Sequence, residues 1–380
     1  MQLSMSQEIN YNGAILHWAI GRAGTSLEKL EKAFPKLPDW ISKRAHPTLK
    51  QLEKLSHTLH VPFGYLFLDS PPNEPIPFPF FRTTGSTNTR ISLNLYDTIL
   101  LNQRRQDWLR DYLRENGAEP LDYVDSFSRK NRPEVIVAAI RKQLGLAEEW
   151  AAGFSTIEES VNFLTERIEE MGVVVIFNGV VENSNGRALP VEECRGFVLV
   201  DPYAPLMFVN NADGKAAQLF TLLHELAHIF IGQSAGFDNG KLLPADDPIE
   251  QLCDQVAAEF LVPAATLLNL WAVDPGIDRL ARHFKVSRIV VARRALDLGK
   301  ITKTAFFKLY AVYRAEIQHK KDTASNGGNF YATQKKRVSI RFAGLVDRAV
   351  KTEQLLYRDA YKLTGLKGDT YSKFMAKYFA

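Results

Sequence analysis

Apolar positions recur along most of the chain at the three- and four-residue spacing of amphipathic helices. Short blocks of this pattern fill residues 12–70 and predict a compact bundle of short helices. In this stretch, Thr25 with Glu28 and Thr48 with Gln51 have the spacing of capping boxes. The chain then enters PPNEPIPFPF, where five prolines in ten residues cannot continue a helix. We expect a linker and a domain boundary there.

The next part of the chain mixes helical spacing with strand-like segments. Residues 91–116 predict a long helix, and RPEVIVAAIRKQLGL and STIEESVNFLTERIEEMG predict two amphipathic helices. The second of these has a Ser155-to-Glu158 capping box. MGVVVIFNG and RGFVLVDPYAPLMFVNN are rich in β-branched and aromatic residues, so they predict strands, with an antiparallel pair around Asp201-Pro202. We expect LMFVNN to offer an edge to an extended peptide.

Helical spacing returns in the rest of the chain. KAAQLFTLLHELAHIFIG and PIEQLCDQVAAEFLVP each predict a helix, and IDRLARHFKVSRIVVARRAL predicts a helix-turn-helix-like pair. The whole pattern predicts an α+β, mostly helical fold with a small β-sheet. The expected division is a helical bundle at 1–73, a linker and long helix at 74–130, a mixed domain at 131–300 and a helical C-terminal domain at 301–380.

Composition and charge refine this division. A length of 380 residues favours more than one domain, and 46% hydrophobic with 24% charged residues is typical of a soluble globular protein. The net charge is only +4, but residues 300–380 carry 17 Lys and Arg against 6 Asp and Glu. This basic tail is consistent with contact to nucleic acid or an acidic partner, and equally with a solvated helical surface. Its candidate phosphate contacts are Lys335, Lys336, Arg337 and Arg341.

Neither a membrane segment nor a disulfide framework is expected. No apolar run reaches membrane-spanning length, and the start, MQLSMSQEINYNG, lacks the basic and apolar regions of a secretory signal. The only cysteines are Cys194 and Cys253, which suits a reducing compartment. We therefore expect a cytoplasmic protein with no membrane partner.

The segment LFTLLHELAHIFIG is apolar apart from Thr221 and a central group of three ionisable residues. His224 and His228 are four residues apart, so on a helix their imidazoles share one face and can hold one metal ion. Glu225 is rotated by about 100° from His224, which places it within reach of a water at that metal. This is the spacing of zinc peptidases, with two ligands and a general base. A metal would also make polar groups tolerable in an apolar segment.

A catalytic zinc usually takes a third protein ligand. Glu250 opens the next predicted helix, and Asp254 lies one turn further on the same face, where it can orient a ligand imidazole. Two alternatives remain open: Asp247, Pro248 and Glu250 also have the pattern of a capped helix start, and Asp254 is equally consistent with solvation. We interpret Cys253 as a buried packing residue. Two imidazoles and a carboxylate suit zinc, with manganese left open.

On these residues, the chain resembles the ImmA/IrrE family of metallopeptidases in its longer form, with an XRE-type helix-turn-helix at the front. The resemblance covers nearly the whole chain. The segments that carry it are RGFVLVDPYAPLMFVNN, AAQLFTLLHELAHIFIGQS, IEQLCDQVAAEFLVP, GGNFY and LLYRDAYKLTGLKGDTYSKF. The resemblance implies a gluzincin-like metallopeptidase domain at 131–300. It also implies zinc bound by His224, His228 and Glu250, with Glu225 as the base.

The resemblance carries expectations about function. Members of this family are typically cytoplasmic and switch on mobile-element or stress genes by cleaving a DNA-binding repressor, and some lie beside toxins as antitoxin-like regulators. It therefore implies a zinc endopeptidase with a repressor as substrate, and with DNA and a nearby toxin as further candidate partners. The alternative is a DNA-binding transcription regulator or antitoxin-like protein with a structural or vestigial metal site. The intact HELAH sequence favours the enzyme, because a vestigial site does not need the base.

The front domain is similar to XRE-type DNA-binding domains in GRAGTSLEKLEKAF and HPTLKQLEKLSHTLHVPFGYLF. Between these segments, Pro35 and Pro38 stand where a recognition helix would start, so we expect that helix to be short. Residues 1–73 hold 8 Lys and Arg against 6 Asp and Glu, a weak positive charge for DNA binding. The best candidate DNA contacts are Lys43, Arg44 and Lys50, for which a solvated face is an equal alternative.

Overall fold

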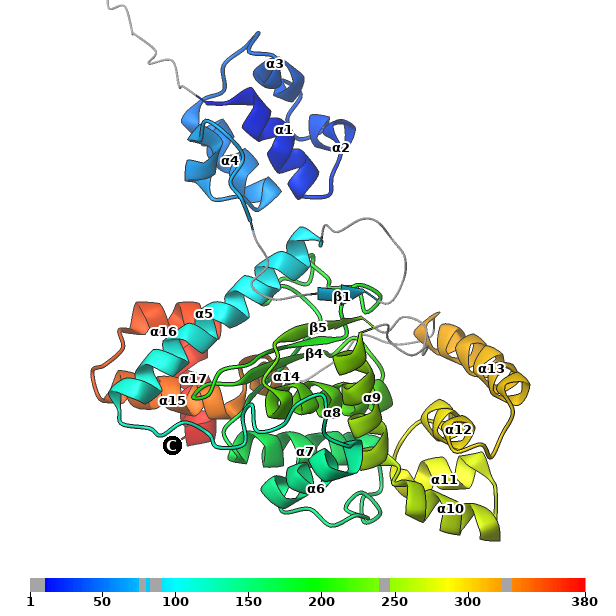
Figure 1. The fold of residues 1–380 in the computed structure, drawn as a ribbon. Helices are drawn as coiled ribbons and strands as arrows, with labels where there is room; N and C mark the ends of the chain where they lie inside the picture. The colour runs from blue at the N-terminus through cyan, green and yellow to red at the C-terminus, as the bar shows by residue number, and fades with distance from the viewer. Residues whose placement is uncertain (1–10, 75–79, 83–90, 239–246, 323–329, 380) are drawn as a thin grey trace, which may run out of the picture. The chain divides into compact units, whose positions relative to one another are not determined.

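A computed structural model of the chain describes residues 11–74, 80–82, 91–238, 247–322 and 330–379. The chain forms two compact units, one made of Met1–Pro77 with Thr87–Asp97 and the other of Phe78–Ser86 with Thr98–Ala380. Most of the described residues are in helices, and the strands form one small sheet (Figure 1). The expected α+β, mostly helical class is confirmed.

The first unit contains a bundle of short helices. Its elements are α1 (Gly13–Arg22), α2 (Leu27–Glu31), α3 (Leu37–Ile41), α4 (Leu49–Leu59) and the 3-10 helix η1 (Phe63–Phe67). Their apolar faces meet in one core, in which Leu16, Trp40 and Leu52 are buried. Helix α3 has only five residues, with Pro38 in its first turn. This agrees with the short helix expected from the two prolines.

The helix starts of this bundle test the predicted capping boxes. The box at Thr48 is confirmed: its side chain accepts a hydrogen bond from the backbone N–H of Gln51, whose side chain accepts one from the N–H of Thr48. The box expected at Thr25 is wrong, because α2 begins one residue later and has a single side-chain cap in place of a capping box. Ser26 is the N-cap of α2, because Ser26 has the extended backbone that precedes a first helical turn.

The second unit is built around a sheet with the strand order β1-β5-β3-β4-β2. The strands are β1 (Phe80–Arg82), β2 (Val174–Asn178), β3 (Gly196–Leu199), β4 (Leu206–Asn210) and β5 (Ala235–Asp238). Strands β3 and β4 are antiparallel, with Phe197 opposite Phe208, as predicted. Part of the expected linker also joins this sheet, because β1 pairs in parallel with β5.

Strand β4 occupies the interior of the sheet. It pairs with β3 on one side and in parallel with β2 on the other, where Val175 lies opposite Met207. The expectation that LMFVNN offers an edge to a peptide is therefore wrong. Every residue of β2 and of β4 is buried, which is the continuous apolar pattern of strands covered on both faces.

The remaining helices surround this sheet. They are α5 (Leu93–Glu115), α6 (Pro133–Leu144), α7 (Ile157–Glu170), α8 (Lys215–Ile231), α9 (Pro248–Leu261), α10 (Ala264–Val273), α11 (Ile277–Phe284), α12 (Arg288–Asp297), α13 (Lys303–Asp322), α14 (Phe330–Val338), α15 (Ile340–Lys351), α16 (Tyr357–Thr364) and α17 (Gly368–Phe379). The capping box of α7 is formed by Thr156 and Glu159, one residue after the predicted pair, because the extended backbone of the N-cap falls at Thr156.

Helix α8 packs against the inner strands β3 and β4 and against α9 and α6, while α7 packs against α8 and the edge strand β2. This arrangement surrounds α8 with apolar side chains, so most of its length is buried. Among the described helices, none is by itself both long and apolar enough to cross a membrane; α9 and α10 meet that test only as a bent pair.

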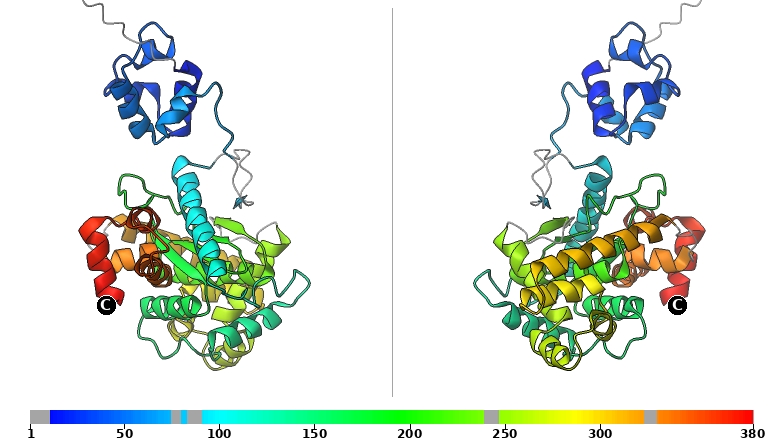
Figure 2. Two further views of the ribbon diagram at one scale, coloured as in Figure 1. Left: turned by 90° about the vertical axis from the view of Figure 1, so that its left-hand side faces the viewer. Right: turned by 90° about the vertical axis from the view of Figure 1, so that its right-hand side faces the viewer.

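Helices α14 to α17 lie beside α5 (Figure 2), and α14 packs against the edge strand β2. The buried guanidinium of Arg105 on α5 joins these parts, since it donates hydrogen bonds to the carbonyl oxygens of Leu363 and Arg337. At the start of α15, the carboxylate of Glu169 on α7 accepts a hydrogen bond from the hydroxyl of Ser339. The last helices are thus joined to the rest of the second unit by buried and partly buried hydrogen bonds.

Candidate metal centre

Helix α8 carries the HELAH sequence through the middle of the core. Its leucines, including Leu222 and Leu226, belong to the same apolar cluster as residues of β3, β4, α7 and α9. The helix ends at Gly232, which has φ +81° and caps the last turn. A side chain there is excluded, because a Cβ would lie 2.1 Å from Oδ1 of Asp125.

The two histidines of α8 face the same point. The Nε2 atoms of His224 and His228 are 3.2 Å apart, and both side chains are fully buried. This follows from their four-residue spacing on a regular helix. The two imidazoles therefore lie on one face of α8, as the spacing in the sequence predicts.

Helix α9 brings Glu250 to the same point. Asp247 is the N-cap of α9 and accepts hydrogen bonds from the backbone N–H groups of Ile249 and Glu250. The Glu250 carboxylate is directed to the histidines, with Oε2 3.1 Å from Nε2 of His224 and Oε1 3.1 Å from Nε2 of His228. Asp247 thus supplies the helix cap, while Glu250 completes a three-residue cluster.

Asp254 lies one helical turn beyond Glu250. His224 donates a hydrogen bond from Nδ1 to Oδ1 of Asp254 over 3.0 Å, which orients the imidazole so that Nε2 points at Glu250. The side chain of Asp254 is 21% exposed, so it is the most solvent-accessible member of the group. Cys253 is buried, and its thiol pKa is raised well above its ordinary value by that burial.

The cluster fits a small metal ion. Each of His224, His228 and Glu250 offers one ligand atom, and these atoms lie within 4.8 Å of one another. Around a tetrahedral zinc with bonds of about 2.0–2.1 Å, ligand atoms are separated by about 3.3 Å, close to the distances in the cluster. The donor set of two imidazoles and one carboxylate also suits such an ion.

Glu225 lies against β3, beside this cluster. Its carboxylate is fully buried, and neither oxygen has a hydrogen-bond partner among the described residues. Gly196 makes room for it, because a Cβ on that glycine would lie 2.9 Å from Oε1 of Glu225 and 2.5 Å from Cγ2 of Thr221. The sequence analysis missed Gly196; the available signal was a glycine within a strand-like run, which often marks a close approach.

The protonation pattern of the metal-free cluster follows from these contacts. Burial opposes a charge on His224, but hydrogen bonds to Asp254 and Glu250 outweigh burial and raise its pKa to about 10. Burial acts against the charge of Glu250 as well, and hydrogen bonds from His224 and His228 lower its pKa to about 2. Burial lowers the pKa of His228 and raises that of Glu225 well above its ordinary value. In the metal-free cluster, His224 is therefore a cation beside the Glu250 anion, and the other two groups, His228 and Glu225, are neutral.

The expected nucleic-acid contacts lie elsewhere. Lys43, Arg44 and Lys50 belong to the first unit and are exposed, and Arg44 pairs with Asp39 over 3.0 Å.

The four candidate phosphate contacts of the tail lie in the second unit. Lys335 and Lys336 lie 3.6 Å from Glu166 and Glu158, and Arg337 donates a hydrogen bond to Asn183. Burial lowers the pKa of the Arg341 guanidinium. Two of these four positive charges are therefore paired with carboxylates within the second unit.

Comparison with known families gives two matches. Residues 338–377 match a domain of unknown function, DUF8813. A search of the curated proteins found no match. Residues 168–296 match the peptidase family described as the IrrE N-terminal-like domain, and this range contains every residue of the cluster. The match supports the ImmA/IrrE family for this part of the chain and suggests a metallopeptidase of that type.

Proposed function

We propose that the protein is a zinc-dependent endopeptidase that cleaves a regulatory protein, a DNA-binding repressor, and thereby controls stress or mobile-element genes. The observation that carries this proposal is the buried His224, His228 and Glu250 cluster with the unpaired carboxylate of Glu225 beside it. A purely structural metal site needs the three ligand residues but does not need Glu225. The repressor, the cytoplasmic location and the control of such genes rest on the family resemblance.

Each residue has a defined role in this proposal. His224, His228 and Glu250 would hold the zinc, which when bound supplies a Lewis acid that polarises a peptide carbonyl and activates water. Glu225 takes a proton from the attacking water at a carboxylate oxygen and passes it to the leaving amine. Burial raises the pKa of Glu225 in the metal-free protein, and the positive charge of a bound metal would favour the ionised carboxylate that accepts the proton. Asp254 acts through His224, whose ring it keeps in one orientation.

The first test is metal content. Elemental analysis of the purified protein should find one equivalent of zinc, and the double variant His224→Ala, His228→Ala should lose it. Zinc-loaded wild-type protein should then cleave a repressor encoded near its own gene, and Glu225→Gln should retain zinc while losing cleavage. Cleavage by Glu225→Gln at the wild-type rate would refute the assigned role of the base.

A second function is supported by the burial of the site. His224, Glu225 and His228 are fully buried and Glu250 is 2% exposed, which suits a structural metal in a transcription regulator or antitoxin-like protein. In that case binding of DNA or of a toxin would survive Glu225→Gln unchanged, and no repressor would be cleaved. For the DNA arm, Lys43, Arg44 and Lys50 are the positions to change, and each loss should weaken binding and lower its salt dependence.

A further inference from the structure

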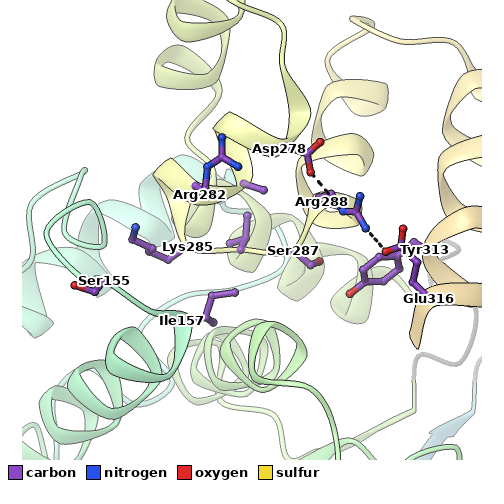
Figure 3. Close-up of a pocket in the computed structure, with 11 residues that line it drawn as sticks. Ser155, Ile157, Asp278, Arg282, Lys285, Ser287, Arg288, Tyr313 and Glu316 are labelled. Atoms are coloured by element: carbon purple, nitrogen blue, oxygen red, sulfur yellow. Dashed lines mark hydrogen bonds and ion pairs between the residues drawn. The ribbon is translucent and has the colours of Figure 1, made fainter. Parts of the chain in front are cut away.

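A pocket of about 410 Å³ opens between the start of α7, the helix pair α11–α12 and helix α13 (Figure 3). Ser155 precedes α7, and Tyr313 belongs to α13. The turn that joins α11 to α12 passes along the pocket with Lys285, which has a left-handed backbone at φ +54°. A pocket of this volume is of the size that takes a small organic molecule.

The basic side chains around this pocket differ in whether they form ion pairs. Arg288 pairs with Asp278 and with Glu316, as the dashed lines of Figure 3 show. Arg282 and Lys285 line the same pocket, and neither has an ion pair with an acidic side chain in the described part of the chain. Arg282 and Lys285 therefore have no acidic partner of their own, and the five charged side chains that line the pocket sum to +1.

Other groups at the pocket also favour an anion. Helix α12 begins there, with Ser287 as its N-cap and Arg288 as its first residue, so the positive end of a ten-residue helix lies at the pocket wall. The hydroxyl groups of Ser155 and Tyr313 add two possible hydrogen-bond donors. These groups act in addition to Arg282 and Lys285, which remain the main positive charges of the proposed site.

The chemistry of the lining selects one class of anion. Two cations without ion pairs offer positive groups to a phosphate monoester, which carries a charge of about −1.5 to −2 at neutral pH. The guanidinium fork of Arg282 suits phosphate oxygens, and the ammonium of Lys285 adds a point charge. Ile157, Ala281 and Val286 give the pocket an apolar wall for the organic part of an ester.

We propose that this pocket is a binding site for a small phosphate monoester, with Arg282 and Lys285 as the residues that bind its phosphate group. The proposal is independent of peptidase activity, because it uses none of the residues of the metal centre. The site is connected to that centre through the core, since Ala281 and Val286 belong to the same apolar cluster as α8. A bound ester would therefore stabilise the unit that carries the metal centre.

Isothermal titration of the full chain with phenyl phosphate, adenosine monophosphate, adenosine and inorganic phosphate tests the proposal. We expect saturable binding of at least one ester with Kd below about 1 mM, and no binding of adenosine. The double variant Arg282→Gln, Lys285→Gln should weaken that binding at least tenfold. The matched control is Lys300→Gln, Lys303→Gln, which removes the same charge from two exposed lysines away from the pocket and should leave Kd unchanged.

Thermal unfolding identifies a double variant that has failed to fold, in which case each single variant is titrated instead. Three results would overturn the proposal: no saturable binding of either ester, equal affinity in the wild type and the folded variant, or inorganic phosphate binding as tightly as the esters. A duplex oligonucleotide is titrated in parallel. If the duplex binds through Arg282 and Lys285 while the esters do not, the pocket recognises a nucleic-acid backbone and the small-molecule assignment is wrong.

Discussion

The metal centre and the pocket at the α11–α12 turn both gather charged side chains where two helices meet, but they treat charge in opposite ways. In the metal centre, the charged groups are buried and contact one another, as Glu250 does with His224. In the pocket, Arg282 is exposed and has no acidic partner in the described part of the chain. Buried charge must be compensated within the fold, whereas exposed charge is left available to a ligand.

The largest expected effect concerns the group that the metal centre leaves unpaired. Glu225→Gln should lower the rate of repressor cleavage by at least about 100-fold, because an amide cannot take the proton of the attacking water. Cleavage is followed by gel electrophoresis at saturating zinc. Glu119→Gln, which changes an exposed carboxylate in the same way, serves as the control and should leave the rate unchanged.

The second-largest expected effect concerns the compensation of buried charge in the metal centre. His228→Ala should destabilise the metal-free second unit by about 3 kcal/mol, because it removes a buried contact of Glu250 and opens a cavity. Urea denaturation gives the free energy of unfolding. His283→Ala, at a position where the ring is 27% exposed and lies 4.0 Å from Glu149, should cost less than about 1 kcal/mol. Equal losses in the two variants would contradict the role given to burial.

A third prediction concerns the space for the base. Gly196→Ala should cost about 1–3 kcal/mol, since the new Cβ would meet Thr221, Glu225 and the carbonyl oxygen of Phe208 within 3.0 Å. Gly186→Ala is the matched control, because a Cβ there meets nothing within 4 Å. Thermal unfolding of both variants compares them directly, and a similar midpoint for the two would show that the close approach at Gly196 is unimportant.

Glu169 extends the comparison to a partly buried carboxyl outside the metal centre. Burial raises its pKa to about 7, although the hydroxyl of Ser339, the backbone of Arg341 and the charge of Lys335 act in the other direction. The folded state therefore holds this proton more tightly than the unfolded state, so its contribution to stability is present below pH 4.5 and is lost as the pH rises to about 7.

Urea midpoints measured across that pH range should show this loss in the wild type. Glu169→Gln should remove this part of the pH dependence, worth about 1–3 kcal/mol. Parallel pH profiles for the wild type and the variant would contradict the raised pKa.

The smallest effect belongs to the pocket. Without ligand, the double variant Arg282→Gln, Lys285→Gln should change the free energy of unfolding by less than about 0.5 kcal/mol, because neither side chain compensates a buried charge. Urea denaturation in phosphate-free buffer measures the change. A loss as large as that of His228→Ala would mean that these cations are structural, and would remove the contrast between the two regions.

Local spacing in the sequence determined several features that the structure has. The four-residue interval between His224 and His228 places both imidazoles on one face of any regular helix, whatever packs around it. The box of Thr48 and Gln51 and the shortness of α3 likewise depend on neighbouring residues. In each case the deciding interactions lie within one helical turn.

Only the tertiary structure decided features that join distant segments. Glu250 reaches His224 across 26 residues because α8 and α9 pack together. Gly196 lies beside Glu225 because β3 packs against α8, and β4 is interior because β2 pairs with the side of β4 that β3 leaves open. Hydrophobic spacing predicts which face of an element is buried, but apolar contact is non-directional, so the partner of that face is selected by the packing of the whole chain.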